Sequence, residues 1–101
     1  MSNETWYSLG IKEQLSNIHG EVVRLIRARN NYRSGKSSSD HTETYLNKIH
    51  DLIEMTCNDP KNVRRKPELL DEESEIKRWV AEEVDDGYIL HYWEQYTNAI
   101  S

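Results

Sequence analysis

The most regular apolar pattern of the chain lies between residues 9 and 30. Its apolar side chains recur at intervals of four, three, four and three, at Ile11, Leu15, Ile18, Val22 and Leu25. In an α-helix this spacing places all of these side chains on one side. The pattern therefore predicts a helix over about 9–30 that packs against another helix.

A second helix is expected over about 41–57. The preceding stretch, NYRSGKSSS at 31–39, contains a glycine and three serines that are typical of a loop. Asp40, followed by Glu43 three residues later, has the spacing of a capping box. The two predicted helices, joined by this loop, are expected to form an antiparallel hairpin at the N-terminal end.

Two further helices are expected, over about 67–85 and 88–99, after a loop at 57–66. Pro67 suits the first turn of the third helix. The apolar stripe expected on that helix consists of Leu69, Leu70, Ile76, Val80 and Val84, with Trp79 at its edge. Residues 85–87, Asp-Asp-Gly, indicate a break or a kink. The pattern leaves open whether the last two helices are separate or form one bent rod.

No alternation long enough to predict a β-strand is present, so the fold class is expected to be all-α. The predicted architecture is a single domain, residues 1–101, folded as a three- to four-helix bundle. Leu, Ile and Val together make up 21 of the 101 residues and Phe is absent. A core this small makes a lone monomer marginal, because folding must outweigh about 1–2 kcal/mol of backbone entropy per residue. We therefore expect a homo-oligomer.

The N-terminal sequence lacks the basic start and apolar run of a signal peptide. A single cysteine, Cys57, excludes an intrachain disulfide and favours a reducing compartment. No stretch approaches the length of a membrane span. The expected location is the cytoplasm, without contact with a membrane.

The charge is distributed unevenly along the chain. Residues 1–66 carry 11 Lys and Arg against 8 Asp and Glu, whereas residues 67–101 carry 2 against 10. Such an excess has two interpretations, a solvated helix face or a docking surface for a basic partner.

Catalytic and metal sites find little support in the sequence. No pair of the four histidines falls at i, i+4, and neither a phosphate-binding loop nor a Ser-His-Asp pattern is present. The carboxylates Asp71, Glu72, Glu75, Glu82 and Asp85 resemble the motifs of the all-α nucleotide pyrophosphohydrolases of the MazG type, a resemblance that implies Mg²⁺ held between two helices. On one continuous helix they would spread along a rod and could not surround one ion. We therefore expect no catalytic residue, no metal and no cofactor.

The C-terminal third combines aromatic residues with most of the acidic charge. Tyr and Trp are enriched among residues that dominate binding energy. The predicted partner-binding set is Trp79, Glu82, Glu83, Asp86, Tyr88, Tyr92, Trp93 and Tyr96. The alternative, that these rings form the core of a chain without Phe, applies above all to Trp79 and Trp93. Residues 92–98, YWEQYTN, resemble the C-terminal tail of the small helical anti-sigma factor of T4-type phages, which binds a subunit of host RNA polymerase; the resemblance assigns no site residue.

The sequence therefore favours a non-enzymatic protein that binds a protein partner, of the inhibitor, immunity, antitoxin or phage anti-defence type. Two alternatives stay open. One is a homo-oligomeric module that binds the phosphate of a nucleotide or nucleic acid through Arg24, Arg27 and Arg29. The other is a structural subunit of a larger assembly.

Overall fold

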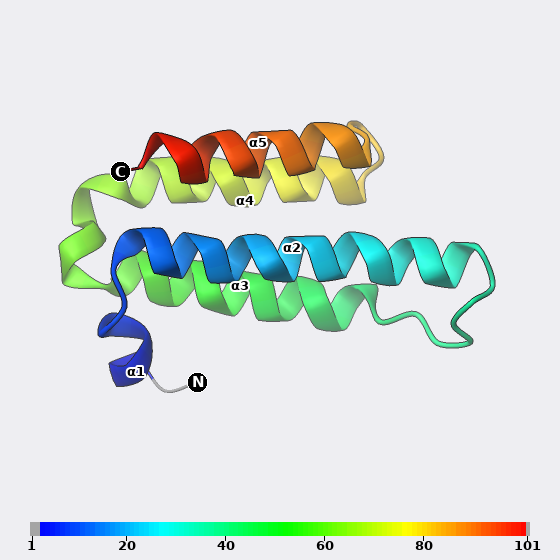
Figure 1. The fold of residues 1–101 in the computed structure, drawn as a ribbon, viewed down its shortest axis with the longest axis horizontal. Coiled ribbons are helices and arrows are strands. Elements are labelled where there is room, and N and C mark those ends of the chain that lie inside the picture. Colours follow the sequence, from blue (N-terminus) through cyan, green and yellow to red (C-terminus); the bar gives the residue numbers. More distant parts are fainter. Residues whose placement is uncertain (1–2, 101) are drawn as a thin grey trace.

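The computed structural model describes residues 3–100, which fold as α-helices and one 3₁₀-helix without any strand (Figure 1). This confirms the all-α class. The elements are α1 (Asn3–Tyr7), α2 (Ile11–Arg33), α3 (Thr42–Asn58), the 3₁₀-helix η1 (Pro60–Arg65), α4 (Lys66–Val80) and α5 (Asp86–Ala99). The number of α-helices within 3–100 is five, against the three to four predicted, because α1 was not expected. Self-association is not addressed by a single chain and stays a prediction.

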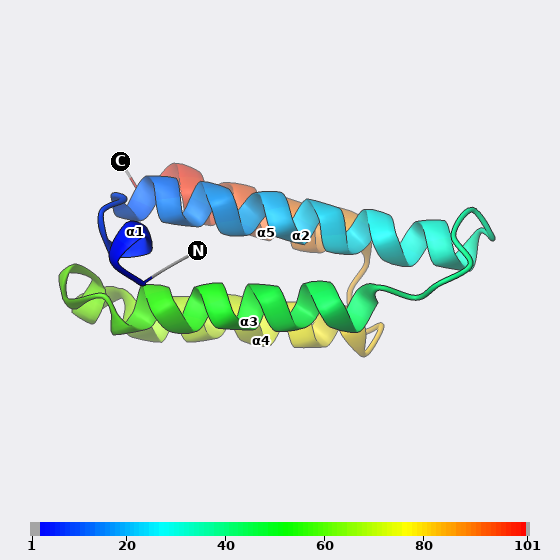
Figure 2. The ribbon, with the colours of Figure 1, turned by 90° about the horizontal axis from the view of Figure 1, so that it is seen from below.

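Two antiparallel helix pairs make up the body of the molecule (Figures 1 and 2). The first pair is α2 with α3, and the second is α4 with α5. Each long helix packs against two others, since α2 contacts α3 and α5 while α4 contacts the same two helices. The short α1 packs against α3. None of the helices within residues 3–100 combines the length and the apolar character that crossing a membrane requires.

The side of α2 predicted from the apolar pattern is the side that faces the core. Four of its five predicted side chains are at most 1% exposed, and Ile11 is half-buried. Helix α3 contributes Ile49, Leu52 and Ile53. The largest fully buried side chains are the three tryptophans, Trp6, Trp79 and Trp93. In a chain without Phe, indole rings therefore fill much of the core.

The buried side of α4 differs from the predicted stripe. The structure buries four side chains at intervals of three, four and three, namely Leu69, Glu72, Ile76 and Trp79. Leu70 and Val80, expected in the core, are 48% and 41% exposed. The prediction was wrong because it included only apolar residues in the buried stripe. It therefore placed Leu70 and Val80 in the core and left out Glu72. The observed spacing places a carboxyl group among core positions.

Helices α4 and α5 are two separate helices, which answers the question left open by the sequence. The prediction that the third helix extends to residue 85 was wrong, because α4 ends at Val80. Glu82 adopts a left-handed conformation, with φ of 63°, and the N–H of Glu83 bonds to the carbonyl of Arg78 at 2.9 Å. This arrangement terminates a helix. Asp85 then caps α5 by accepting a hydrogen bond from the N–H of Tyr88 at 2.8 Å.

The predicted loop at 57–66 is largely helical. Residues 60–65 form η1, whose first residue is Pro60 and whose N-cap Asp59 accepts a bond from the N–H of Lys61. The expected capping box of α3 is also absent. The N-cap of α3 is His41, and Asp40 instead accepts a bond from the N–H of Thr42 at 3.0 Å.

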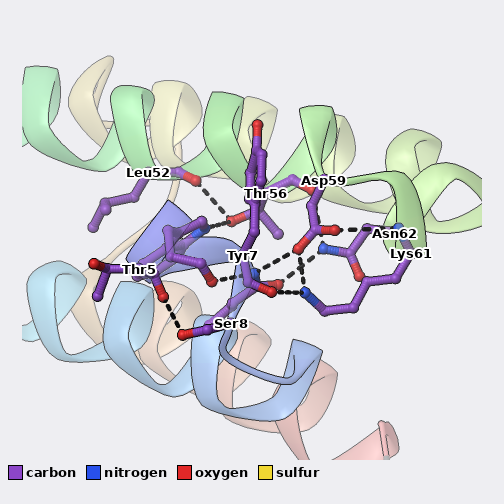
Figure 3. A network of polar contacts seen from close by, with 10 residues as sticks. Thr5, Tyr7, Ser8, Leu52, Thr56, Asp59, Lys61 and Asn62 are labelled. Atoms are coloured by element: carbon purple, nitrogen blue, oxygen red, sulfur yellow. Dashed lines mark hydrogen bonds and ion pairs between the residues drawn. The ribbon is translucent and has the colours of Figure 1, made fainter. Parts of the chain in front are cut away.

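A buried polar network joins α1, α2, α3 and η1 (Figure 3). The side-chain amide of Gln14 donates to the carbonyl of Trp6 at 2.9 Å and to Asp59 at 3.0 Å. Its oxygen accepts from Asn62 at 2.9 Å. The indole of Trp6 in turn donates to the hydroxyl of Thr56 at 2.9 Å. The network therefore fixes the corner where the chain passes from the first helix pair to the second.

Asn62→Ala is expected to lower the free energy of unfolding by about 2–3 kcal/mol. The substitution leaves the Gln14 oxygen without its donor and removes one of the bonds to the Thr56 carbonyl, which keeps the N–H of Asp59. A buried group without a partner costs about 1–3 kcal/mol. Urea denaturation followed by circular dichroism measures the change. Asn47→Ala is the matched control, since Asn47 is exposed and makes no side-chain hydrogen bond to residues 3–100. Equal stability of the two variants would contradict the role assigned to the network.

Candidate functional site

The two tryptophans of the predicted partner-binding set lie in the core. Trp79 and Trp93 have no exposed surface. The indole N–H of Trp79 donates to Asp86 at 2.7 Å, so this ring also holds the start of α5. Neither side chain is available to a partner in this conformation. For these two residues the structure corresponds to the core alternative, in which indole rings fill the centre of a chain without Phe.

Glu82 and Glu83 lie in the loop between α4 and α5 and are engaged within the chain. Glu82 forms an ion pair with Arg33 at the end of α2. Glu83 lies 3.5 Å from Arg78 of α4. The predicted acidic surface is therefore partly neutralised at this loop by the protein's own cations.

Asp86 has a structural role at the same loop. Besides the bond from Trp79, it accepts from Asn30 at 3.0 Å and from Arg29 at 3.4 Å. Burial opposes ionisation of Asp86, but the hydrogen bonds from Trp79 and Asn30 and the charge of Arg29 together lower its pKa. Asp86 therefore remains an anion that ties α2 to α4 and α5.

The three tyrosines of the predicted set form a row along α5. Tyr88, Tyr92 and Tyr96 are spaced by four residues, and the rings of Tyr88 and Tyr92 are stacked with centroids 6.0 Å apart. Tyr88 is 40% exposed, and the other two are half-buried. The hydroxyl of Tyr96 donates to Glu68 of α4 at 3.4 Å. This part of the predicted set is brought together on one side of α5.

Carboxylates of α4 accompany this row. We call the resulting surface the acid–tyrosine groove, defined by Glu68, Asp71, Glu72 and Glu75 of α4 and Tyr88, Tyr92 and Tyr96 of α5. Part of it is a cavity of about 280 Å³. Its lining consists of three carboxylates, two tyrosines, one cation and two apolar residues, namely Glu68, Asp71, Glu72, Tyr92, Tyr96, Arg65, Ala99 and Ile100. The sequence analysis considered three of these carboxylates only as metal ligands and missed Glu68. The spacing of the carboxylates could have indicated this surface. Positions 68, 72 and 75 are four and three residues apart and so share one side of a helix, as the tyrosines do.

Glu72 is the unusual member of the groove. Its side chain is 3% exposed, it forms no hydrogen bond or ion pair with residues 3–100, and its Oε2 is buried without a partner. Burial, followed by the charges of Glu75, Asp71 and Glu68, raises its pKa to about 8. The carboxyl group therefore retains its proton at neutral pH. Strongly perturbed groups at a cavity are candidates for functional sites.

The groove has an excess of negative charge that the chain itself only partly balances. Arg78 forms an ion pair with Glu75 at 3.1 Å, and Arg65 lies 3.9 Å from Glu68. Asp71 is exposed and makes no ion pair with any residue from 3 to 100. Burial and the charge of Glu72 raise the pKa of Tyr92, so its hydroxyl stays neutral and can donate hydrogen bonds. The site thus offers acceptors and aromatic faces to a cation.

The three arginines of the alternative phosphate site do not lie together. The guanidinium of Arg29 lies over the ring of Trp79, 3.4 Å from its centroid, and donates to the Trp79 carbonyl at 3.1 Å. Arg24 and Arg27 instead border a separate cavity with His41. The prediction of one three-arginine site was wrong, because residues two apart on a helix point in different directions.

Among residues 3–100, one set of side chains has the spacing of metal ligands. One group of three, His50, Asp51 and Glu54 of α3, places its ligand atoms within 4.8 Å of one another, and all three are exposed. His50 also lies 3.2 Å from Glu73 of α4. His50 therefore forms part of the contact between α3 and α4. The carboxylates that resemble a magnesium motif are divided between α4 and the loop after it.

Glu72→Gln is expected to stabilise the protein increasingly as the pH rises from about 4.5 to about 8. The folded-state pKa of Glu72, about 8, lies above its ordinary value of 4.5, so the folded state holds a proton that the unfolded state releases over this range. Wild-type stability therefore falls with pH, and the glutamine variant lacks this loss. The difference in unfolding free energy should grow by up to about 5 kcal/mol and level off above pH 8. Urea denaturation at several pH values measures it; a constant difference would contradict the protonated carboxyl.

Comparisons with known proteins assign no family to this chain. A scan against protein-family models found no match, and searches of curated proteins and of solved structures found no significant match. The geometry of the acid–tyrosine groove is therefore the basis of the function proposed below.

Proposed function

We propose that this chain is a non-enzymatic protein that binds a basic segment of a partner protein in the acid–tyrosine groove. The observation that carries this proposal is Glu72, a carboxyl at a core position that borders a cavity and has no partner among residues 3–100. A buried polar group without a partner lowers stability by about 1–3 kcal/mol. A cation supplied by another molecule would remove that cost.

An arginine side chain matches the chemistry of the groove. Its planar guanidinium stacks on tyrosine rings and binds carboxylates through two parallel hydrogen bonds. Tyr92 and Asp71 border the same cavity and offer both contacts. A lysine ammonium lacks the planar stacking surface. The groove therefore favours arginine among the basic side chains.

A protein segment fits the length of the groove better than a single small cation. From Tyr88 to Tyr96 the row extends over eight helical residues, about 12 Å at the rise of an α-helix. Carboxylates accompany it from Glu68 to Glu75. Two or more basic side chains of one segment can contact such a row at the same time. This supports a peptide or helix as the ligand, in agreement with the docking-surface interpretation of the acidic C-terminal third.

Binding of a cation beside Glu72 is coupled to proton release. The carboxyl holds a proton at neutral pH because burial and neighbouring acids raise its pKa to about 8. A guanidinium nearby stabilises the ionised form and lowers that pKa, so the proton leaves on binding. Affinity is therefore expected to increase with pH up to about 8 and to level off above it.

The test uses a defined basic peptide rather than an unknown partner. An alanine-based helical peptide with arginine at every fourth position is titrated into ¹⁵N-labelled protein. We expect saturable shifts of amide signals on α4 and α5 along the groove, weakened about threefold or more by Asp71→Asn and more strongly by Tyr92→Ala. Calorimetry in two buffers of different ionisation enthalpy should show proton release near pH 7, which Glu72→Gln abolishes.

The matched controls are Glu94→Gln and Tyr32→Ala. Glu94 lies on α5, is exposed and makes no ion pair with residues 3–100, so its replacement makes the same charge change as Asp71→Asn outside the groove. Tyr32 is 44% exposed on α2. Neither control should alter the affinity by more than about twofold, within the range of exposed ion pairs. Equal effects of Asp71→Asn and Glu94→Gln would show attraction by net charge alone and refute the groove.

A further inference from the structure

A second cavity lies on the α2–α3 pair, where the C-terminal half of α2 meets the loop and the start of α3. It has a volume of about 340 Å³. Six polar side chains border it, namely Arg24, Arg27, Asn31, Ser37, His41 and Tyr45. No carboxylate of residues 3–100 is among its lining groups. In a chain with a net charge of -5, a cavity lined by basic groups and hydrogen-bond donors is a distinct chemical environment.

Arg27 is available to a ligand. It is exposed and forms no hydrogen bond or ion pair with any residue between 3 and 100. Arg24, one helical turn before it, bonds to Glu21 at 2.6 Å, but Lys48 also lies 3.1 Å from the same Glu21 oxygen. Lys48 can therefore neutralise Glu21 when Arg24 turns toward an anion. The two guanidinium groups border the same cavity and can act together.

The N-terminus of α3 borders this cavity and carries the partial positive charge of a helix start. Its N-cap residue, His41, borders the cavity, and no side chain caps this end of the seventeen-residue helix by the usual bond. Asp40 binds the N–H of Thr42, one residue into the helix. Backbone N–H groups and the positive end of the helix dipole favour anions at such a position.

Another cavity with two arginines provides the contrast. Arg29 and Arg33 border a larger hollow of about 760 Å³ at the α4–α5 loop, together with Glu82, Glu83, Asp85 and Asp86. Four carboxylates balance two arginines there, and Asp86 and Glu82 already bind them. The cavity at Arg24 and Arg27 is therefore better suited to an anion than this hollow.

We propose that the Arg24–Arg27 cavity binds a phosphate-bearing molecule of mononucleotide size. Guanidinium groups match phosphate oxygens in charge and in paired hydrogen bonds. Tyr45 at the cavity wall supplies an aromatic face on which a base can stack. The volume falls in the range of small-molecule sites, about 300–1,000 Å³. This site is independent of the acid–tyrosine groove and does not rest on its proposed function.

The experiment titrates inorganic phosphate and adenosine monophosphate separately into the wild-type protein, followed by NMR shifts and calorimetry. Both should bind saturably, the nucleotide more tightly. Arg27→Gln is expected to weaken both at least about tenfold, because a charge-assisted contact is lost. Tyr45→Ala should weaken only the nucleotide, and Tyr45→Phe, which keeps the ring, should restore it. Circular dichroism verifies that each variant is folded.

Arg64→Gln is the control for charge. Arg64 is an exposed residue of η1 that makes no ion pair with residues 3–100, so its replacement changes the net charge equally at a distance from the cavity. Arg64→Gln should change the affinity for either ligand by less than about twofold. The proposal is overturned if neither ligand saturates at millimolar concentration, if Arg27→Gln and Arg64→Gln have equal effects, or if phosphate and the nucleotide bind equally well.

Discussion

The side-chain amide of Gln14 is the interaction on which the arrangement of the two helix pairs depends. It binds α1 through the Trp6 carbonyl, the end of α3 through Asp59 and η1 through Asn62. These bonds hold α1, α2, the end of α3 and η1 together at the corner from which the chain continues into α4 (Figure 3). Gln14 belongs to α2, which contacts α3 of its own pair and α5 of the other pair. The network is therefore anchored on the helix that joins the two pairs. The groove between α4 and α5 is carried by that second pair.

The stripe on α2 could be predicted from the sequence because it consists entirely of apolar residues at helical intervals. The corner at Gln14 could not. Its residues are polar, come from four elements and are brought together only by the fold. A propensity analysis assigns such residues to the surface or to a loop, which is why η1 was predicted as a loop. The polar groups are tolerated in the core because each has a hydrogen-bond partner.

Glu72 shows the opposite case, a buried polar group without a partner. A prediction that minimises buried charge moves the stripe of α4 to Leu70 and Val80, both of which are exposed in the structure. The buried side of α4 could have been identified from Leu69, Ile76 and Trp79, which are seven and three residues apart and share one side of a helix. Among the predicted site residues, Tyr88, Tyr92 and Tyr96 lie on one side of α5, as their spacing of four residues requires. Which acids accompany it depends on how α4 packs against α5, and this is not encoded in either helix alone.

Helix geometry explains both the error and the useful part of the arginine prediction. Arg27 and Arg29 are two positions apart, so their side chains leave α2 on different sides. Arg24 and Arg27, three apart, share one. Arg29 was therefore free to pack on Trp79 and to hold Asp86. The rotation of α2 about its axis thus places Arg29 against Trp79 and, on another side, Arg24 and Arg27 at one cavity.

The positions of the three indoles have a spectroscopic consequence. Each is shielded from water, yet each has a different polar environment. Trp6 donates to a hydroxyl and Trp79 to a carboxylate, whereas the buried Trp93 nitrogen has no acceptor among residues 3–100. Their emission should therefore be blue-shifted in the native state and move to longer wavelength on denaturation. Since the rings lie in α1, α4 and α5, proteins that retain one of them at a time would report whether both helix pairs melt as one cooperative unit.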